Sequence, residues 1–445
     1  MSSTLLTART SGQETLANEF FQKNGAVKYV HLQWLDYSGV LRTRIITLAT
    51  AKDIAAGNMR YSLAQNCMVI PVSTAPACFP DGIEDWRLLP DWSSVRLCGY
   101  RHTHATVQCF LAHMGLEDPF ARCPRHLLSL AVDDLSIHPA KALVGFEIEF
   151  VLLDQDNNAA RSMDQTVGYS MTAGLRTKNM DIIEKIVDTL EISGIGTYHF
   201  HVEGVDQFEI ALSPLPPVEA VDSLMVAQET IRTITLHHGL RGTLAPKPIL
   251  KGPKSGLHAH LSLYGGFTAM SDHFLAGALA KMRALCAFGL ANFDSYDRVA
   301  GDCAGEWVGF GTGNKDLPIR RVHDNRWEFR ALDATANTYL FMATLLYSGA
   351  HGMVAKLQPK SQDCQVVPSA LSYEEAKMKL GELGITESVP NSLAESLAAL
   401  KEDKDIERWI GKELLTQYSR VKEKEVEYFG KMTEEERRLK FVSYF

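Results

Sequence analysis

The chain has 445 residues, of which 46% are hydrophobic and 22% charged, values typical of a globular protein of two or three domains. A net charge of -8 argues against a general nucleic-acid-binding surface, so we expect no nucleic-acid partner. The sequence has neither an N-terminal apolar signal segment nor an apolar run of about 18 residues, so we expect no membrane partner and a cytoplasmic location.

The N-terminal part of the chain has the pattern of a small sheet. Residues 1–14 are polar, and we expect them to be frayed. Residues 27–34 and 40–48 have the composition of two strands around a turn, which predicts a hairpin, and residues 105–112 predict a further strand. Residues 85–96 contain a proline and predict a loop.

Beyond this sheet, strands and helices alternate without the regular rhythm of a parallel sheet, which predicts an α+β fold. We place the domain boundary near residues 113–122, which gives an N-terminal domain of residues 20–115 and a second domain of residues 120–445. The tail, residues 372–445, is mostly helical, and charged runs such as residues 422–425 are typical of solvated helix faces. The predicted strands of the second domain are 143–153, 199–212, 256–264 and 325–332, and its predicted helices are 126–132, 179–193, 217–238, 271–291 and 335–356.

A carboxylate stands between two arginines at strand spacing late in the chain. Because side chains at i, i+2 and i+4 share one face of a strand, Arg326, Glu328 and Arg330 would lie together, and Trp327 and Phe329 would face a core. Two guanidiniums beside a carboxylate suit a site that handles a divalent cation and nucleotide phosphates. Taken alone, the pattern favours a surface ion-pair ladder, since such pairs are common and weak.

Three other segments supply matching groups. Glu147 and Glu149 would share a strand face about 6.6 Å apart, where they repel unless a cation lies between them, although a solvated face explains this pair alone. Glu203 and Glu209 are two carboxylates on either side of a short turn. His258, His260 and Ser262 alternate along an apolar strand and would share one face of it.

Together, five carboxylates and a histidine predict two cation sites of mixed oxygen and nitrogen ligands, which suit Mg²⁺ or Mn²⁺ bound with a nucleotide. The eight cysteines include no Cys-x-x-Cys pair, which favours reduced thiols over disulfides or a cysteine-based zinc site. Residues 309–313 are rich in glycine but lack the lysine of a phosphate-binding loop, so we expect a flexible loop there.

The order E-x-E, E-x5-E, G-x-H-x-H-x-S and R-x-E-x-R, followed by D-x-x-A-N-x-Y-L at residues 333–340, resembles the glutamine synthetase family over nearly the whole chain. The resemblance implies a small N-terminal β-grasp domain and a large catalytic domain with a curved antiparallel sheet. It also implies ATP as cosubstrate, a small-molecule acid and amine as substrates, and a homo-oligomer of stacked rings, often a dodecamer, with active sites between subunits.

The resemblance implies roles for the matched residues. Asp36 matches the aspartate that a neighbouring subunit contributes to the ammonium site, and Arg298 matches the arginine that holds the substrate carboxylate. Arg320 and Arg330 match arginines that stabilise phosphoryl transfer and the acyl phosphate. One metal would be bound by Glu149, Glu203 and Glu209, the other by Glu147, His258 and Glu328, and the nucleotide by His260, Ser262, Lys315 and Arg326.

The implied chemistry has two steps. ATP phosphorylates the γ-carboxylate of glutamate while the metals and arginines neutralise the developing charge. The acyl phosphate then reacts with an amine to give an amide, with ADP and phosphate as the other products, and Asp36 would help to deprotonate the incoming ammonium.

The sequence departs from the family on the acceptor side. The family has Asn-Gly-Ser-Gly before its first histidine, whereas this chain has Pro253 and Lys254, which remove an amide donor and add a charge. Where the family places a glutamate over the ammonium site, this chain has Cys303 or Ala304, with Glu306 slightly displaced. A missing carboxylate at this place is typical of γ-glutamyl ligases that use larger amines.

Two smaller departures concern the metal and nucleotide positions. The spacing from Glu203 to Glu209 is one residue shorter than usual, with Asp206 in place of a glycine. Lys315 replaces an ATP-contacting arginine, which keeps the charge but loses the planar fork.

These patterns favour a ligase that joins glutamate or a related acid to an organic amine, as in glutamine-synthetase-like γ-glutamylamide ligases. The resemblance extends to the glutamine-synthetase-like domains of fungal developmental proteins. Two alternatives stay open: an ordinary glutamine synthetase that uses ammonia, and an inactive ring-forming protein with a structural or regulatory role.

Overall fold

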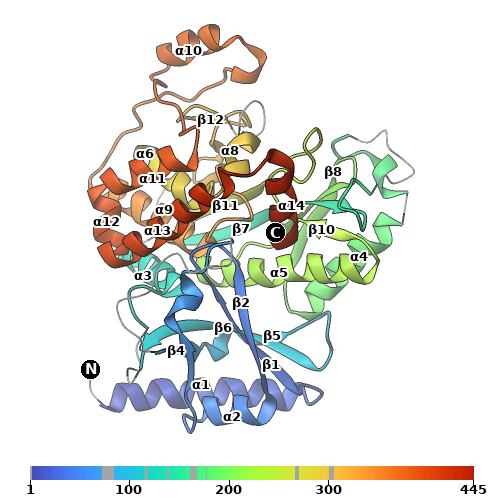
Figure 1. Ribbon diagram of the computed structural model, residues 1–445. Helices are drawn as coiled ribbons and strands as arrows, with labels where there is room; N and C mark the ends of the chain where they lie inside the picture. The colour runs from blue at the N-terminus through green and yellow to red at the C-terminus, as the bar shows by residue number, and fades with distance from the viewer. Residues whose placement is uncertain are drawn as a thin grey trace.

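The computed structural model describes residues 3–72, 85–114, 116, 119–137, 140–160, 168–176, 178–265, 270–299 and 305–445. Its strands form two sheets, a six-stranded sheet in the lower half of Figure 1 and an eight-stranded sheet in the upper half, and helices pack around both. This mixture confirms the α+β prediction. Within these ranges, no helix is long and apolar enough to cross a membrane.

The first sheet has the strand order of a β-grasp fold. The order is β2-β1-β6-β4-β3, with β5 paired to β6, and β1 and β6 run parallel at its centre. Helices α1 (Ser3–Lys23) and α2 (Leu48–Ala55) lie beneath it in Figure 1. The strands are β1 Tyr29–Leu35, β2 Leu41–Thr47, β3 Tyr61–Ala64, β4 Asp85–Pro90, β5 Arg96–Leu97 and β6 His104–His113.

Two predictions for this sheet were wrong. Residues 1–14 were expected to be frayed, but most of them belong to α1, where Gln13 Oε1 accepts the Trp92 N–H at 2.7 Å and Ala17 and Phe21 are buried. The helix therefore docks through its second half. Residues 85–96 were expected to form a loop, but β4 pairs with both β3 and β6, and its proline is its last residue, where a missing N–H interrupts only the end of the ladder.

The second sheet is the curled sheet implied by the resemblance, in the order β12-β13-β14-β11-β7-β9-β8, with β10 paired to β7. All four predicted strand regions are present, and the region 199–212 is a hairpin of two strands. Residues 309–313 are not a flexible loop, because β12 lies there and a Cβ on Gly311 would lie 2.2 Å from the Cys364 carbonyl oxygen. The strands are β7 Lys141–Leu153, β8 Thr197–Gly204, β9 Gln207–Leu212, β10 Arg241–Thr243, β11 Leu257–Tyr264, β12 Phe310–Thr312, β13 Ile319–His323 and β14 Arg326–Phe329.

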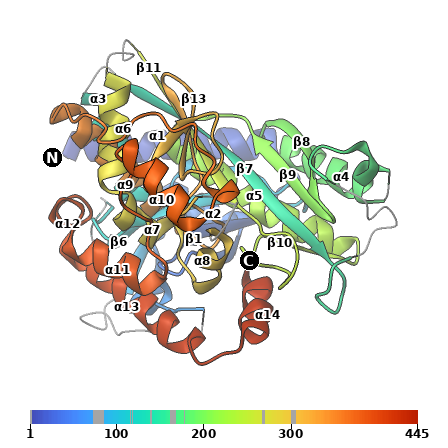
Figure 2. The same cartoon turned by 90° about the horizontal axis from the view of Figure 1, so that it is seen from above.

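Helices surround this sheet unevenly. Figure 2 shows α4 near β8, while α6, α9, α11 and α12 gather at the opposite end of the molecule. The predicted helix 271–291 is split in two at Lys281, whose ammonium binds Asp403 and Asp405 of the C-terminal region. The helices are α3 Pro124–Ile137, α4 Asn179–Ile192, α5 Pro217–His237, α6 Ser271–Ala280, α7 Met282–Gly289, α8 Phe293–Val299, α9 Thr338–Val354, α10 Tyr373–Glu382, α11 Leu393–Glu402, α12 Lys404–Ile410, α13 Lys412–Phe429 and α14 Glu434–Tyr444.

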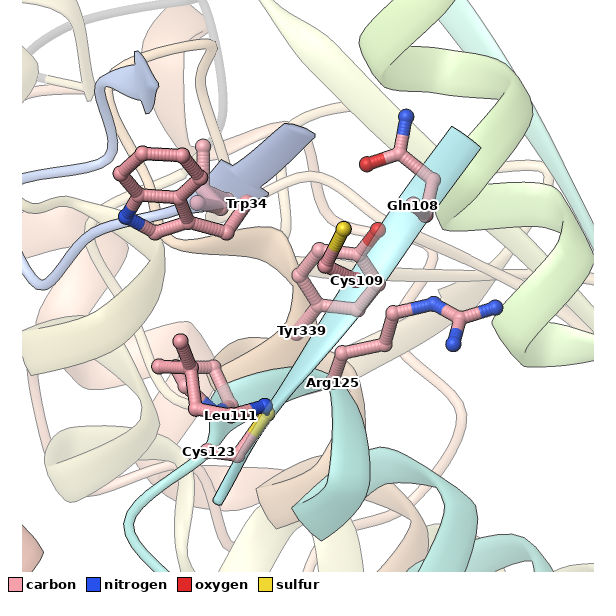
Figure 3. Close-up of a pocket in the computed structure, with 9 residues that line it drawn as sticks. Trp34, Gln108, Cys109, Leu111, Cys123, Arg125 and Tyr339 are labelled. Carbon is pink, nitrogen blue, oxygen red and sulfur yellow. Dashed lines mark hydrogen bonds between the residues drawn. The ribbon is translucent and has the colours of Figure 1, made fainter. Parts of the chain in front are cut away.

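A buried arginine joins the two halves of the molecule. The Arg125 guanidinium on α3 donates to both Asp222 carboxylate oxygens, at 2.9 and 2.7 Å, and to Asp91 beyond β4 at 2.7 Å. Tyr339 on α9 donates its hydroxyl to the same Asp222. Figure 3 shows the cavity beside this network, which is lined by Trp34 among others and has a volume of only about 10 Å³. A cavity of that size holds at most one water, so this is a structural junction and no substrate site.

The charged run at residues 422–425 is not a solvated face, contrary to prediction. The side chains of Lys422 and Glu425 are 0% and 1% exposed and form an ion pair at 2.8 Å. Lys422 also lies 3.4 Å from the Ser38 carbonyl oxygen, and Glu425 accepts the Val72 N–H at 3.0 Å. The pair therefore fastens α13 to the loops that follow β1 and β3. Glu423 and Lys424, on the outer side of the same helix, are exposed as predicted.

Replacing Lys422 with methionine should destabilise the protein by about 3–5 kcal/mol, because it leaves the buried Glu425 carboxylate without its cation. Urea unfolding measures the change. The matched control is Lys424→Met, which breaks the exposed pair with Glu427 on the same helix and should change stability little. The double variant Lys422→Met/Glu425→Leu should recover part of the loss, since no buried charge remains. Equal effects of the two single variants would contradict this assignment.

Candidate active site

Strand register brings the predicted residues onto one wall of the curled sheet. His258 lies opposite Glu147 across β11 and β7, and His260 lies opposite Glu328 across β11 and β14. The same register places Ser262 opposite Arg326, and Glu149 opposite Glu209 across β7 and β9. Alternate residues, such as Phe146 and Trp327, are buried in the core, which fixes the polar residues on the other face.

Glu328 lies at the centre of this wall and is 1% exposed. Its Oε2 accepts from Arg320 at 2.8 Å and its Oε1 accepts from Arg330. Burial raises the pKa of Glu328, but the electrostatic interactions with His258 and Arg330 outweigh it and lower the pKa to about 2. Glu328 and Arg330 are therefore buried, with Arg320 partly exposed beside them, so this carboxylate is not part of a surface ladder.

His258 faces two carboxylates without a hydrogen bond to either. Its Nδ1 lies 3.4 Å from Glu147 Oε2 and 3.5 Å from Glu328 Oε1, and it is a buried nitrogen with no hydrogen-bond partner among the described residues. Burial and the charge of Arg330 lower the pKa of His258, which favours the neutral, metal-binding form. Neighbouring octahedral ligands at about 2.1 Å from Mg²⁺ lie about 3.0 Å from one another, so a small inward movement of these side chains would let them share a cation.

Carboxylates crowd the other side of the wall. Glu149 Oε2 accepts the Gly256 N–H at 2.8 Å and the Gln207 side-chain amide at 3.1 Å. Burial and the charge of Glu149 raise the pKa of Glu203 to about 7. Burial and the neighbouring carboxylates, Glu147 first, raise the pKa of Glu209 to about 9. Ionisation of all these carboxylates together is unfavourable unless a cation lies among them.

The donor set therefore fits divalent cations. Glu147, Glu209 and His258 offer ligand atoms that lie within 4.8 Å of one another, and so do Glu147, His260 and Glu328. These groups mix the two predicted ligand sets and add His260, which contacts Glu147 at 2.9 Å. Neither group includes Glu149 or Glu203, but Glu149 Oε1 lies 3.7 Å from His258 Nε2, and Glu203 Oε1 lies 3.7 Å from His201 Nε2.

The predicted nucleotide residues adjoin the cluster. His260, Ser262 and Arg326 line one pocket together with Glu147, and the Arg326 guanidinium lies 3.3 Å from His260 Nδ1. Lys315 is exposed, and its ammonium lies 5.1 Å from the centre of the Tyr169 ring. Its charge acts to lower the pKa of Glu203, which places it at the rim of the site.

Arg298 reaches the cluster from α8. It is 2% exposed, its Nη2 lies 3.3 Å from His258 Nε2, and it lies 3.4 Å from the Arg330 carbonyl oxygen. A Cβ on Gly256 would lie 2.6 Å from Arg298 and 2.7 Å from His258, so only glycine fits here. The altered loop before Gly256 touches the site as well, because the Lys254 carbonyl oxygen accepts from Gln207.

The remaining predicted catalytic residues are Asp36 and Glu306. Asp36 is 0% exposed, and its oxygens accept from Arg42 and from the N–H groups of Ser38 and Val40. Burial raises the pKa of Asp36 to about 6. These contacts lie within one chain, so the role of Asp36 toward a neighbouring subunit stays a prediction. Glu306 is half-buried, and its carbonyl oxygen accepts the Val389 N–H. Cys303 and Ala304 lie outside the described residues.

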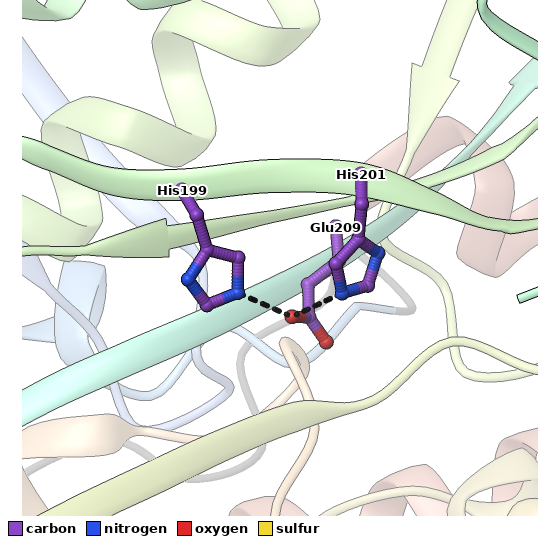
Figure 4. A group of neighbouring side chains, drawn as sticks. All are labelled: His199, His201 and Glu209. Carbon is purple, nitrogen blue, oxygen red and sulfur yellow. Dashed lines mark ion pairs between the residues drawn. The ribbon is translucent and has the colours of Figure 1, made fainter. Parts of the chain in front are cut away.

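Sequence reasoning missed three residues of the site. Gln207 supports Glu149, as described above, and His199 and His201 face Glu209 from β8 (Figure 4). The signal for the histidines was present, because His199 and His201 alternate on a strand just as His258 and His260 do.

A family model described as the catalytic domain of glutamine synthetase matches residues 121–440. The chain belongs to the glutamine synthetase family. Protein fluG of Emericella nidulans is 33% identical over 98% of this chain, which spans 52% of the length of fluG. Type-1 glutamine synthetase 1 of Dictyostelium discoideum is 24% identical over 95% of this chain and 91% of its own length. Glutamate–isopropylamine ligase of a Pseudomonas species is 29% identical over 63% of this chain and 66% of its own length.

Solved structures show the same fold. A structure of GmaS without ligand has a TM-score of 0.80 at 21% identity, covering 94% of this chain and 97% of its own. A GmaS/ADP complex has a TM-score of 0.81 at 21% identity, covering 95% and 98% of the two chains. The glutamine synthetase fold therefore extends over both sheets of this chain.

The metal-free protein should lose stability as the pH rises from about 5 to about 9. The pKa values of Glu203 and Glu209, about 7 and about 9 when folded, exceed the ordinary value of 4.5, so in this window the folded state holds more protons than the unfolded state. A bound cation replaces those protons. The increase in melting temperature caused by Mn²⁺ should therefore be larger at about pH 8 than at about pH 6.

Thermal unfolding with and without Mn²⁺ measures this difference, and Glu209→Gln should reduce it because the amide does not titrate. An equal effect of Mn²⁺ at both pH values in the unchanged protein would contradict the assigned cluster.

Proposed function

We propose that this protein is an ATP-dependent ligase that joins glutamate, or a related acid, to an organic amine through an acyl phosphate. The observation that carries the proposal is the buried Glu328, held between Arg320 and Arg330 on the wall that presents Glu147 and His258. A buried carboxylate with this environment suits phosphate and cation chemistry more than it suits a structural ion pair, because a neighbouring histidine nitrogen stays unpaired.

Two cations, Mg²⁺ or Mn²⁺, would be held by the predicted residues and would supply positive charge to the phosphates of ATP. The ligand sets support this assignment by their carboxylate and imidazole donors: Glu149, Glu203 and Glu209 for one cation, and Glu147, His258 and Glu328 for the other. His260, Ser262, Lys315 and Arg326 would bind the nucleotide. The pocket that His260, Ser262 and Arg326 line beside Glu147 supports this assignment.

The arginines would divide the remaining work. Arg298 would hold the acid substrate, and Arg320 and Arg330 would face the transferred phosphoryl group. A carboxylate oxygen of the acid attacks the γ-phosphorus, and the bond to ADP breaks. The amine nitrogen then attacks the acyl carbon, phosphate leaves, and the nitrogen loses a proton. Asp36 of a neighbouring subunit and Glu306 remain the predicted residues for that proton.

An organic amine is favoured over ammonia because Cys303 or Ala304 stands where the family places a glutamate over the ammonium site. Pro253 and Lys254 replace the residues expected for glutamate recognition, and Lys254 approaches the Arg298 carbonyl oxygen at 3.5 Å. The relative named glutamate–isopropylamine ligase supports an amine of this class. This chain spans 52% of the length of fluG, so fluG contains sequence outside the matched region.

ADP release tests the proposal. With ATP, Mg²⁺ or Mn²⁺ and glutamate, we expect turnover with one or more organic amines from a panel of monoamines, polyamines and amino acids, and at least about tenfold less with ammonia. Glu328→Gln should lower the activity at least about a hundredfold, because the variant lacks the negative charge that both arginines and the cation site bind. Comparable turnover with ammonia alone would favour an ordinary glutamine synthetase. ATP binding without ADP release for any acceptor would favour the inactive alternative.

We further propose a ring-type homo-oligomer with sites between subunits. Strand β2 supports it, because β2 is an edge of the first sheet and Ile45 on it is 54% exposed. Light scattering should give a mass several times 49.4 kDa, and a monomer at micromolar concentration would contradict the proposal.

A further inference from the structure

A second histidine pair lies beside the carboxylate cluster, on the edge strand β8. His199 and His201 point to the same face of β8, and their rings stack with centroids 5.5 Å apart. Both rings direct Nε2 at the same oxygen, Oε1 of Glu209 on the neighbouring strand β9 (Figure 4). None of the roles proposed above uses either histidine.

The distances are those of metal ligands and not of hydrogen bonds. Glu209 Oε1 lies 3.7 Å from His199 Nε2 and 3.4 Å from His201 Nε2, beyond the usual length of an N–H···O bond. The three ligand atoms lie within 4.8 Å of one another. Ligands placed tetrahedrally around a zinc ion are separated by about 3.3 Å, so a small inward movement of the side chains would complete three of four positions.

The surroundings hold the two imidazoles in place. The Tyr198 ring packs against His199 at 5.4 Å between centroids, and the Tyr169 ring meets His201 edge-on at 5.1 Å. The side chain of His199 is 43% exposed and that of His201 is 18% exposed. A cation can therefore enter from solvent, and a water can take the fourth position.

The donor types select the cation. Two imidazoles and one carboxylate suit Zn²⁺ and related transition ions, whereas Mg²⁺ prefers oxygen ligands in octahedral geometry. The carboxylate-rich wall on the other side of Glu209 has the opposite preference. The imidazole-rich region therefore favours transition-metal ions and the carboxylate-rich wall favours Mg²⁺, although both regions include Glu209.

We propose that His199, His201 and Glu209 form a separate binding site for a transition-metal ion of the Zn²⁺ class. The site needs neither ATP nor an acid or amine substrate, so it does not depend on the proposed ligase function. Because Glu209 is shared, an ion bound here draws one carboxylate oxygen toward β8.

Zinc binding in the presence of excess Mg²⁺ tests the proposal. Metal-free full-length protein, with millimolar Mg²⁺ to occupy oxygen-rich sites, is titrated with Zn²⁺ against a chromophoric chelator, and bound zinc is counted by elemental analysis. We expect His199→Ala to bind one zinc ion fewer per chain at the same free zinc, or to bind it more than about tenfold more weakly. His199→Cys should retain the ion, because a thiolate also binds zinc.

The matched control is His237→Ala, which removes an exposed histidine at the end of α5, outside the cluster, and should leave zinc binding unchanged. Circular dichroism confirms that each variant is folded. The proposal is overturned if His199→Ala binds zinc with unchanged stoichiometry and affinity, or if the unchanged protein binds no zinc beside Mg²⁺. Neither readout involves ADP release, so failure here and failure of the ligase proposal are separate results.

Discussion

Mutual repulsion among buried carboxylates is the constraint on which the rest of this structure depends. Glu147, Glu149, Glu203, Glu209 and Glu328 gather on one face of a curled sheet, where burial weakens their hydration. Arg320 and Arg330 neutralise Glu328, but they leave Glu203 and Glu209 with raised pKa values. The protein alone therefore provides only part of the positive charge that its own site requires, and a cation has to provide the rest.

Such a cluster persists because the opposite face of the sheet is firmly packed. Phe146, Ile148 and Phe150 alternate with the carboxylates of β7 and are fully buried or nearly so. A shift of the strand register by one residue would move the carboxylates into the core and the apolar side chains to the opposite face. Burial of the apolar residues therefore fixes the positions of the carboxylates. The unfavourable electrostatic energy of the site is offset by the core behind it. Function and stability thus lie on opposite faces of the same strands.

Sequence alone predicted what depends on spacing along one strand. The shared faces of Arg326 with Glu328, and of His258 with His260, follow from the two-residue period of a strand, and the order of motifs indicated the family. Contacts between distant segments were not predictable in this way. In the sequence, Lys422 and Glu425 have the pattern of a solvated helix face. In the structure, the loops after β1 and β3 cover both side chains. Asp36 matched a motif, but Arg42 and two backbone N–H groups bind it locally.

The metal and phosphate residues largely keep the family's motifs, whereas the residues of the acceptor side depart from them. Strand register accounts for this difference. Most of the metal and phosphate residues stand on paired strands. His260, for example, lies between Gly145 of β7 and Glu328 of β14, so register with two neighbours fixes its position. The acceptor side is built from segments outside the ladder, such as the loop of Pro253 and Lys254, whose backbone has no register to keep. Gly256 marks the boundary, because a side chain there would collide with Arg298 and His258 at once.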